Sequence, residues 1–237
     1  MMTEEQKQRY SRHLVLNGIG EEGQEKLLRS KVLIVGAGGL GSPVAMYLSA
    51  AGVGNIGIAD GDIVSISNLQ RQIIHRTQDV GMMKVNSAER AMKDINPEVN
   101  VMKYNRFLRQ EDLLDIVKEY DFVVDCTDNF AIKYLINDVC VKMGKPFSMG
   151  GINRFQGQVM TCVPGTTDYR SLFPEPPERV ETCEETGVLG CIAGICGSLL
   201  ATEVIKYLTG STDLLINTLL IFDAKKMEFE KICIVKK

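Results

Sequence analysis

The sequence predicts an α/β fold in which a mostly parallel β-sheet carries helices on both faces. Short apolar runs rich in β-branched residues alternate with longer helical stretches between residues 31 and 150, as in sheets whose parallel strands are joined by helices. One run, Val32–Val35, leads into the turn Gly36–Gly41, GAGGLG, and then into a helix. The next run ends at Asp60. A strand, a glycine turn, a helix and an acidic strand end, in this order, predict a Rossmann-like nucleotide-binding core.

This core is expected to occupy residues 31–150, with strands and helices in alternation. Each strand is a short apolar run, and each helix is a longer stretch with the spacing of an amphipathic helix. Strands are expected over Val32–Val35, Asn55–Ala59, Asn100–Tyr104, Tyr120–Asp125 and Pro146–Met149, and helices over Ser42–Ala51, Gly81–Ile95, Glu111–Lys118 and Phe130–Met143.

A helical arm and a closing segment flank the core. The arm, residues 1–30, is expected to hold an amphipathic helix over Thr3–Asn17 and a shorter helix over Glu21–Arg29. After Gly151 the alternation changes, so residues 151–237 are expected to form a crossover loop and closing strands. Antiparallel strands are expected over Gln158–Val163, Leu214–Phe222 and Met227–Val235, with a loop over Pro164–Gly187 and a buried helix over Val188–Leu208. We interpret residues 1–237 as a single domain.

Composition and charge limit the kinds of molecule that the chain is expected to bind. The chain of 237 residues has a formal net charge of −3 at pH 7, which disfavours a nucleic-acid surface or a polybasic membrane patch. Residues 1–10 are charged and polar and show no secretion signal, and the longest apolar run, Val188–Ala201, is too short and too rich in glycine for a membrane span. We therefore expect a cytoplasmic protein that binds neither nucleic acid nor membrane. The seven cysteines include no C-x-x-C pair, which argues against a structural zinc site.

The turn Gly36–Gly41 matches the G-x-G-x-x-G pattern of phosphate-binding turns. Gly36 permits the tight turn, Gly38 lets the backbone approach a phosphate, and Gly41 lets the helix lie close to the strand. The N–H groups at the start of that helix then point at the phosphate, while Asp60 is placed to accept hydrogen bonds from a ribose. These residues predict a nucleotide site, but they do not distinguish NAD, FAD and ATP.

Charged residues around this turn favour phosphate chemistry. Arg71 lies in the long polar connection after Asp60, Lys84 lies in the first turn of the next helix, and Arg12 lies in the arm. Two carboxylates, Asp125 and Asp128, follow the fourth strand; we interpret Asp125 as structural. Cations neutralise phosphate charge and a carboxylate holds Mg²⁺, so the set suits nucleotidyl transfer better than hydride transfer. The two histidines are poorly placed as general bases, but activating a carboxylate with ATP requires none.

Seven motifs are spread between Arg9 and about Phe222. They are Arg9–Arg12 (RYSR), Gly36–Ser42 (GAGGLGS), Ser67–Gln72 (SNLQRQ), Gly81 with Lys84, Asp125–Asn129 (DCTDN), Leu172–Pro177 (LFPEPP), and Cys183 followed by Thr186–Val188. Together they are far more specific than the glycine turn alone. On these motifs the chain resembles the ThiF/MoeB/HesA family, the bacterial relatives of ubiquitin-activating enzymes.

The resemblance implies an adenylyltransferase that uses ATP and Mg²⁺. Its substrate is the C-terminal glycine of a small ubiquitin-like sulfur carrier protein with a Gly-Gly end, similar to ThiS of thiamine synthesis or MoaD of molybdopterin synthesis. The resemblance implies catalytic roles for Arg71, Lys84 and Asp128, with Asp128 as the Mg²⁺ ligand. Arg12 is similar to an arginine that reaches the neighbouring subunit's active site, which implies a catalytic role for Arg12 and a homodimer. The implied nucleotide contacts are Gly36, Gly38, Gly39, Gly41, Asp60, Ser67, Asn68, Arg71, Lys84, Asp128 and Asn129.

The chain departs from this family at its cysteines. Most members hold zinc through two C-x-x-C pairs, but the place of the first pair reads Asp168–Ser171 and residues 232–237 contain no second pair. We therefore expect no zinc, and expect packing alone to close this part of the fold. Cys183 is a further catalytic candidate, because some members form a thioester or an acyl-disulfide at the matching position. The three neighbouring glutamates disfavour its thiolate.

Three alternatives stay open. The glycine turn by itself permits an NAD-dependent oxidoreductase. The same activation chemistry on a different carboxylate, carried by a tRNA or a peptide, would use the same charged residues. A scaffold that only docks a ubiquitin-like protein would need none of them. The sequence does not choose between the thiamine, molybdopterin and other sulfur pathways.

Overall fold

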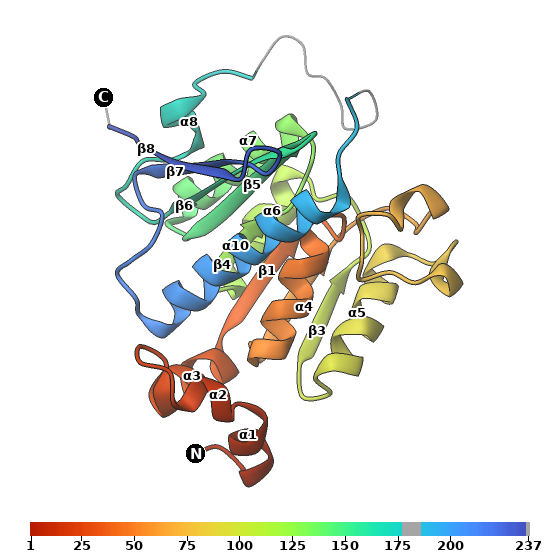
Figure 1. The fold of residues 1–237 in the computed structure, drawn as a ribbon, viewed down its shortest axis with the longest axis vertical. Helices are drawn as coiled ribbons and strands as arrows, with labels where there is room; N and C mark the ends of the chain where they lie inside the picture. The colour runs from red at the N-terminus through yellow and green to blue at the C-terminus, as the bar shows by residue number, and fades with distance from the viewer. Residues whose placement is uncertain (177–185, 236–237) are drawn as a thin grey trace.

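The computed structural model describes residues 1–176 and 186–235 and confirms the predicted α/β fold. Eight strands form one sheet in the order β3-β2-β1-β4-β5-β6-β7-β8 (Figure 1). The first five strands are parallel, and β6, β7 and β8 add to the β5 edge as antiparallel strands. The strands are β1 (Lys31–Val35), β2 (Asn55–Ala59), β3 (Asn100–Tyr104), β4 (Phe122–Asp125), β5 (Phe147–Asn153), β6 (Gln156–Cys162), β7 (Thr218–Asp223) and β8 (Glu228–Cys233).

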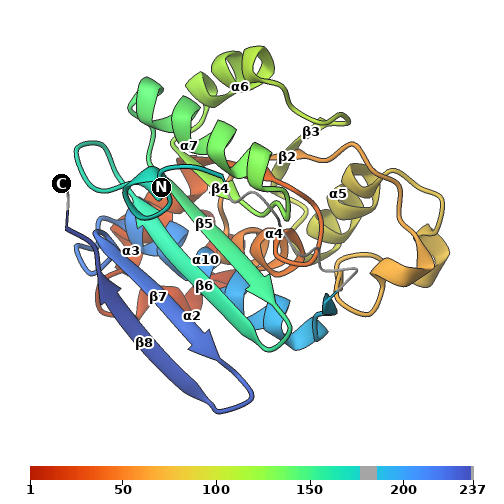
Figure 2. The same cartoon turned by 90° about the horizontal axis from the view of Figure 1, so that it is seen from above.

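Helices cover both faces of this sheet (Figure 2). The arm contributes α1 (Glu4–Arg9), α2 (Ser11–Leu14) and α3 (Gly20–Arg29). The other α-helices are α4 (Gly41–Ala51), α5 (Lys84–Ile95), α6 (Gln110–Ile116), α7 (Phe130–Met143), α8 (Tyr169–Leu172) and α10 (Gly190–Thr209), with short 3₁₀ turns at Ile66–Asn68, Thr77–Asp79 and Val117–Glu119. Helices α4, α5 and α10 pack on one face, and α6 and α7 pack on the other.

The side chains of strand β1 contribute to the hydrophobic cores on both faces of the sheet. Successive side chains of a strand point to opposite faces. Val32 and Ile34 join the core under α4 and α10, whereas Leu33 and Val35 join the core under α6 and α7. All four side chains are at most 4% exposed. A strand buried on both faces must be apolar at every position, which is why the run shows no polar alternation.

The strand order places a crevice at the carboxyl ends of β1 and β4. The strands β2 and β3 lie on one side of β1, whereas β5 and the antiparallel strands lie beyond β4. The connections that leave β1 and β4 therefore diverge. In open α/β sheets, ligands bind in the crevice at such a switch point. The arm lies at the opposite end of the sheet, below the amino end of β1 in Figure 1.

The prediction of one continuous helix over Thr3–Asn17 is wrong, because the helix is interrupted at Tyr10 and divided into α1 and α2. The Tyr10 side chain is 2% exposed and its hydroxyl accepts a hydrogen bond from Asn96 Nδ2 at 2.9 Å. Its ring also lies where a Cβ at Gly52 would stand. Docking this ring against the ends of α4 and α5 turns the backbone out of the helical conformation, which local periodicity does not report.

The pair Gly150 and Gly151 was expected to end the fifth strand, but β5 continues to Asn153. A Cβ at Gly150 would stand 2.9 Å from both the Sγ of Cys196 and the Cδ1 of Leu200. Gly150 is thus required by the close approach of α10 to the strand and not by a turn. The turn comes later, between β5 and β6, where Arg154 has a φ of 53°. The loop predicted over Pro164–Gly187 contains the short helix α8 at Tyr169–Leu172, which Asp168 caps, and its residues 177–185 lie outside the described structure. The remaining predicted helices and strands are present with ends shifted by a few residues.

The helix α10 is longer than the apolar run suggested. An 18-residue window within this 20-residue helix has a mean hydropathy of 1.5, so by length and composition the helix could cross a membrane. The helix extends beyond the run Val188–Ala201 to Thr209, close to the end of the buried helix expected over Val188–Leu208. Within the described structure, α10 packs against α4, β5 and β6, and side chains such as Leu200 and Val204 are fully buried. Its place in the core of the fold accounts for its apolar composition.

Polar contacts anchor the segment where most relatives of the resembled family carry zinc cysteines. The Tyr134 hydroxyl of α7 lies within hydrogen-bond distance of two backbone carbonyl oxygens, those of Phe173 (2.9 Å) and Glu175 (2.8 Å). Arg170 of α8 donates to both carboxylate oxygens of Asp138 and stands 4.8 Å from the centroid of the Tyr134 ring. The expectation that packing alone closes this part of the fold was therefore wrong.

Replacing Tyr134 by phenylalanine is expected to lower the free energy of unfolding by about 1 kcal/mol, because the carbonyl oxygens of Phe173 and Glu175 lose this hydroxyl as a donor while the ring stays. For a chain of this size this corresponds to a fall in Tm of about 2–4 °C. Tyr47→Phe is the control, since the Tyr47 side chain is 55% exposed and bonds to no described residue. Thermal unfolding measures both, and a chelator should leave the wild-type Tm unchanged. Equal Tm values for the two variants would contradict the anchor.

Candidate functional site

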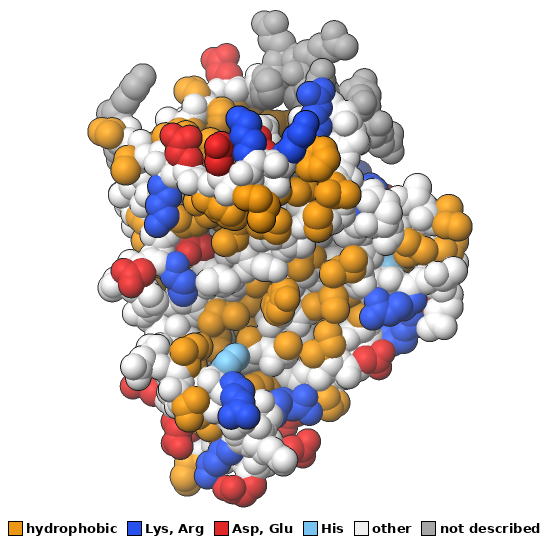
Figure 3. Space-filling model, viewed as in Figure 1, with side chains coloured by type: hydrophobic (Ala, Val, Ile, Leu, Met, Phe, Trp, Pro, Cys, Tyr) orange, Lys and Arg blue, Asp and Glu red, His pale blue; other side chains and the backbone are white. Residues whose placement is uncertain are grey.

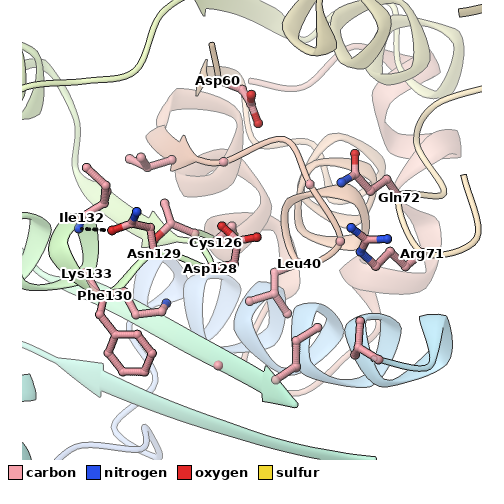
Figure 4. Close-up of a pocket in the computed structure, with 18 of the residues that line it drawn as sticks. Leu40, Asp60, Arg71, Gln72, Cys126, Asp128, Asn129, Phe130, Ile132 and Lys133 are labelled. Atoms are coloured by element: carbon pink, nitrogen blue, oxygen red, sulfur yellow. Dashed lines mark hydrogen bonds between the residues drawn. The ribbon is translucent and has the colours of Figure 1, made fainter. Parts of the chain in front are cut away.

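A pocket of about 1020 Å³ opens at the switch point between β1 and β4. The glycine turn lies on one wall, and the loop after β4 lies on the other. Figure 4 shows Arg71 and Gln72 on one side, Asp128 and Asn129 facing them, and Asp60 at a third edge. Asp60, Arg71 and Gln72 belong to the connection after β2, and Asp128 and Asn129 belong to the loop after β4, so only the folded sheet brings the two sets together.

The glycine turn has the backbone that its sequence predicts. Gly36 has a φ of +102°, in the left-handed region that favours glycine, and a Cβ there would stand 2.8 Å from the Cys126 carbonyl oxygen. A Cβ at Gly41 would overlap the carbonyl oxygen of Gly36. Gly38 and Gly39 line the pocket. The first and last glycines therefore permit the turn, and the middle two leave the backbone open to a ligand.

The peptide groups of Ala37 are held from two directions. Its N–H donates to Asp60 Oδ2 at 2.8 Å, and its carbonyl oxygen accepts from His75 Nε2 at 2.9 Å. His75 Nδ1 lies 2.9 Å from the hydroxyl of Ser87, which in turn donates to Asp79 at 2.6 Å. His75, Ser87 and Asp79 are each at most 4% exposed. A buried chain of hydrogen bonds thus fixes the turn that would hold a phosphate.

This chain of hydrogen bonds gives His75 a structural role and a pH signature. Burial lowers the pKa of the imidazole from its ordinary value of 6.5, although the Ala37 carbonyl opposes this shift. Below about pH 6.5 the unfolded chain takes up a proton that the folded chain resists. The free energy of unfolding should therefore fall with decreasing pH, by at most about 1.4 kcal/mol per pH unit from this group.

We expect His75→Gln to reduce that slope, because the glutamine amide can still donate to Ala37 but does not titrate. Urea unfolding at about pH 7 and about pH 5 measures the slope. The wild type itself supplies the reference, since every other ionisable group is shared. Parallel curves for the two proteins would show that His75 titrates alike in the folded and unfolded chains.

Asp60 occupies the predicted place at the end of β2. Burial raises the pKa of its carboxyl, and the nearby Lys84 ammonium opposes that shift. Lys84 is 6% exposed, and its Nζ lies 2.8 Å from Asp62 Oδ2 and 3.9 Å from Asp60 Oδ2. Both residues line the pocket. In this structure the ammonium is held by carboxylates, and its predicted contact with a phosphate stays a prediction.

Arg71 lies over the glycine turn as predicted. Its Nη1 donates to the Ser67 carbonyl oxygen at 3.1 Å, and its side-chain carbons would stand within 4 Å of a Cβ at Gly39. This single backbone contact fixes the guanidinium at the pocket wall. The guanidinium has five N–H donors in total, so most of them are available to an anion in the pocket.

The loop after β4 carries the carboxylate predicted to bind Mg²⁺. Asp128 lines the pocket and is exposed, and its side chain bonds to no residue that the structure describes. In contrast, Asn129 Oδ1 accepts from the Ile132 N–H and caps α7. Mg²⁺ is commonly held by one or two carboxylates together with substrate phosphates. A free carboxylate that faces the phosphate-binding turn fits this ion, and the assignment stays a prediction.

Among the described residues, four that were predicted for the site lie outside the pocket lining: Gly41, Ser67, Asn68 and Arg12. Ser67 pairs with the hydroxyl of Ser65, and Asn68 Oδ1 accepts from the Ser65 N–H, so both side chains serve a local turn. Arg12 is exposed on α2, in the arm at the far end of the sheet. Cys183 lies outside the described residues. The roles expected for these four residues and for Cys183 stay predictions.

Several pocket residues were not predicted from the sequence. Gln72 is 5% exposed and its Oε1 has no hydrogen-bond partner in the described structure. It follows Arg71 in the SNLQRQ motif, which was the available signal. Lys133 lies in α7 beside Asp128, but its helical spacing resembles that of a solvated residue. The hairpin β5–β6 adds Asn153 and Gln156, for which strand alternation gave no indication.

Comparison with known proteins identifies the family of this chain. The model of the ThiF family matches residues 10–237. A Mycobacterium tuberculosis protein named probable adenylyltransferase/sulfurtransferase MoeZ is 45% identical over 99% of this chain, and the chain spans 62% of that relative. The sulfur carrier protein adenylyltransferase of Thermus thermophilus is 43% identical, over 98% of this chain and 89% of its own length.

Solved structures agree on the fold. E. coli MccB, solved with AMPCPP and MccA, has a TM-score of 0.85 at 24% identity and covers 97% of this chain and 72% of its own. At this identity the likeness shows the fold alone. The resemblance inferred from the sequence motifs is confirmed by the family match and by relatives that are more than 40% identical over nearly the whole of this chain. The chain belongs to the ThiF family.

Proposed function

We propose that this chain uses ATP and Mg²⁺ to adenylate the C-terminal glycine of a ubiquitin-like sulfur carrier protein, with release of pyrophosphate. The observation that carries the proposal is the convergence of the glycine turn, Asp60, Arg71, Lys84 and Asp128 on one pocket. Relatives named as adenylyltransferases of sulfur carriers and of molybdopterin synthase support it. The oxidoreductase alternative leaves the cationic residues and the free carboxylate without a task.

The pocket offers room for more than the phosphates. Beyond the glycine turn its wall continues along α7, α8, the β5–β6 hairpin and β7, where Phe130, Tyr169 and Ile221 provide apolar surface. Asn153 and Gln156 add amide groups to the same wall. An extended peptide end presents apolar and amide surface in alternation, and this wall matches both. The carboxyl end of a carrier would enter along this side and meet the nucleotide at the glycine turn.

The proposed reaction requires no general base. A carboxylate oxygen of the carrier attacks the α-phosphorus of ATP and forms the new P–O bond, and the bond to the bridging oxygen breaks with its electron pair left on pyrophosphate. Negative charge accumulates on the phosphate oxygens during this step, and Arg71 and Lys84 are placed to stabilise it. Mg²⁺, when held by Asp128, would neutralise phosphate charge as a Lewis acid.

The test is ATP–pyrophosphate exchange in the presence of a ubiquitin-like carrier that ends in Gly-Gly. We expect exchange that depends on the carrier, and a gain in carrier mass equal to one adenylyl group, that is, AMP less one water. A carrier that lacks the final glycine is the control. Binding of NAD without binding of ATP would overturn the proposal. Exchange with a tRNA-bound carboxylate or a free peptide, but with no carrier, would assign the same chemistry to another acceptor.

We further propose a homodimer in which Arg12 serves the site of the neighbouring subunit. Arg12 lies at the opposite end of the sheet from its own pocket, so it serves a pocket only in another copy. Figure 3 shows hydrophobic side chains gathered over α4 and α10 on one face of the molecule. Tyr47 of α4 and Leu189, which immediately precedes α10, are 55% and 48% exposed. An apolar face of this kind is typical of a protein interface.

Mixing two inactive variants tests this arrangement. Arg12→Ala and Arg71→Ala are each expected to lose exchange activity when assayed alone. In mixed dimers, one site combines an intact Arg71 with the partner's Arg12, so activity should be partly restored. Two Arg12→Ala preparations mixed together are the control. Failure to restore activity, with light scattering showing that mixed dimers formed, would overturn the role of Arg12 in trans.

A further inference from the structure

Lys133 is a buried cation on the pocket floor that the proposed chemistry leaves without a role. It lies in the first turn of α7, five positions after Asp128, and is 6% exposed. A lysine at the start of a helix opposes the helix dipole, and burying an ammonium is costly unless it is paired. Its position therefore requires a local explanation.

Two acceptors hold the Lys133 ammonium. Nζ donates to Asp125 Oδ2 at 3.1 Å and to the Gly150 carbonyl oxygen at 2.6 Å. Asp125 is the last residue of β4 and is fully buried, whereas Gly150 lies on β5, the neighbouring strand. One side chain thus ties α7 to the ends of two strands at the switch point of the sheet.

The other oxygen of Asp125 shapes the loop that follows. Asp125 Oδ1 accepts from both the backbone N–H of Thr127 at 2.9 Å and the Thr127 hydroxyl at 2.7 Å. A carboxylate that accepts the N–H two residues later closes an Asx turn. This turn bends the chain away from β4 immediately before Asp128. The direction in which Asp128 leaves the sheet is therefore set by Thr127, Asp125 and Lys133.

We propose that Lys133 is a positioning residue for the metal ligand Asp128, acting through Asp125 and Thr127. Lys133 holds the Asp125 carboxylate in place, and Asp125 keeps Thr127 in the turn that presents Asp128 to the phosphates. This inference rests on the proposed function, because it takes Asp128 to be the Mg²⁺ ligand. Hydrogen-bond partners behind a metal ligand typically alter metal affinity by about 10–100-fold when removed.

The central experiment replaces Thr127, which breaks the relay and leaves the buried ion pair intact. Thr127→Val removes the hydroxyl at nearly constant shape, and Thr127→Ser retains it. Calorimetry of ATP binding across a range of Mg²⁺ concentrations gives the apparent Mg²⁺ affinity without any turnover. We expect Thr127→Val to weaken that affinity by about 10-fold, Thr127→Ser to match the wild type, and ATP binding in EDTA to be equal in all three.

A double variant tests the ion pair between Lys133 and Asp125, because removing only one partner would leave an unpaired buried charge. Lys133→Met combined with Asp125→Asn removes both charges, and the same weakening of Mg²⁺ affinity is expected. Lys206→Met is the control, because Lys206 also pairs with a buried carboxylate, Glu203, but lies on α10 outside the pocket lining. Its Mg²⁺ affinity should equal that of the wild type.

The outcomes separate this inference from the proposed function. If Mg²⁺ does not strengthen ATP binding in the wild type, Asp128 is not a metal ligand. That result would overturn both the positioning role of Lys133 and the proposed function. If the wild type shows the Mg²⁺ effect but Thr127→Val and the Lys133/Asp125 double variant keep the same apparent affinity, only the relay is overturned.

Discussion

Replacing Asp128 by asparagine is expected to lower ATP–pyrophosphate exchange by about 100-fold or more, with the fold unchanged. The carboxylate is exposed, lines the pocket and makes no bond to the described part of the chain, so its loss removes no internal contact. Asparagine keeps the shape but not the charge that holds Mg²⁺. Stabilisation of developing phosphate charge by one such group is worth about 3 kcal/mol, or about two orders of magnitude in rate.

The matched control is Asp94→Asn. Asp94 is an exposed carboxylate on α5 that lies outside the pocket lining and bonds to no described residue. It should exchange pyrophosphate at the wild-type rate. Excess Mg²⁺ should restore part of the activity of Asp128→Asn, because a weakened site is filled by mass action. An Asp128→Asn protein with wild-type activity at low Mg²⁺ would remove Asp128 from the site.

The parts of the site that local sequence dictates were predictable. The glycine turn is one such part, because the backbone of the turn itself, within a few residues, requires glycine at Gly36 and Gly41. Asp60 is another, since the end of a parallel strand next to that turn has only one place in the fold. Both belong to short segments whose neighbours are fixed by chain connectivity. Prediction from the sequence succeeds where the contact partners are near in the chain.

The parts that depend on distant partners were not predictable. Tyr10 breaks its helix because its hydroxyl meets Asn96, 86 positions away. Gly150 lies inside a strand because α10 packs directly on it. Lys133 looks like a solvated helix residue until β4 and β5 supply Asp125 and the Gly150 carbonyl. In each case a tertiary contact overrides the local pattern, and one sequence carries no record of that contact.

Replacing Arg71 by alanine is expected to lower exchange by roughly 100-fold, which corresponds to about 3 kcal/mol of lost stabilisation. The guanidinium is held at the pocket wall by the Ser67 carbonyl oxygen and directs its remaining donors toward the glycine turn. Arg71→Lys should recover little of the loss, because an ammonium lacks the planar fork that binds two phosphate oxygens together. Initial rates at saturating carrier and varied ATP measure both variants.

Arg76→Ala is the control for Arg71. It removes a cation from the same connection, but Arg76 donates to the Ile73 carbonyl oxygen and lies outside the pocket lining. Its exchange rate should equal that of the wild type.

This pair of variants also decides between an enzyme and a scaffold. A scaffold that only docks a ubiquitin-like protein would perform its task in cells with Arg71→Ala as well as with Arg76→Ala. An enzyme would retain carrier binding in both variants and lose function only in Arg71→Ala, because the guanidinium acts on the phosphates and not on the docked protein.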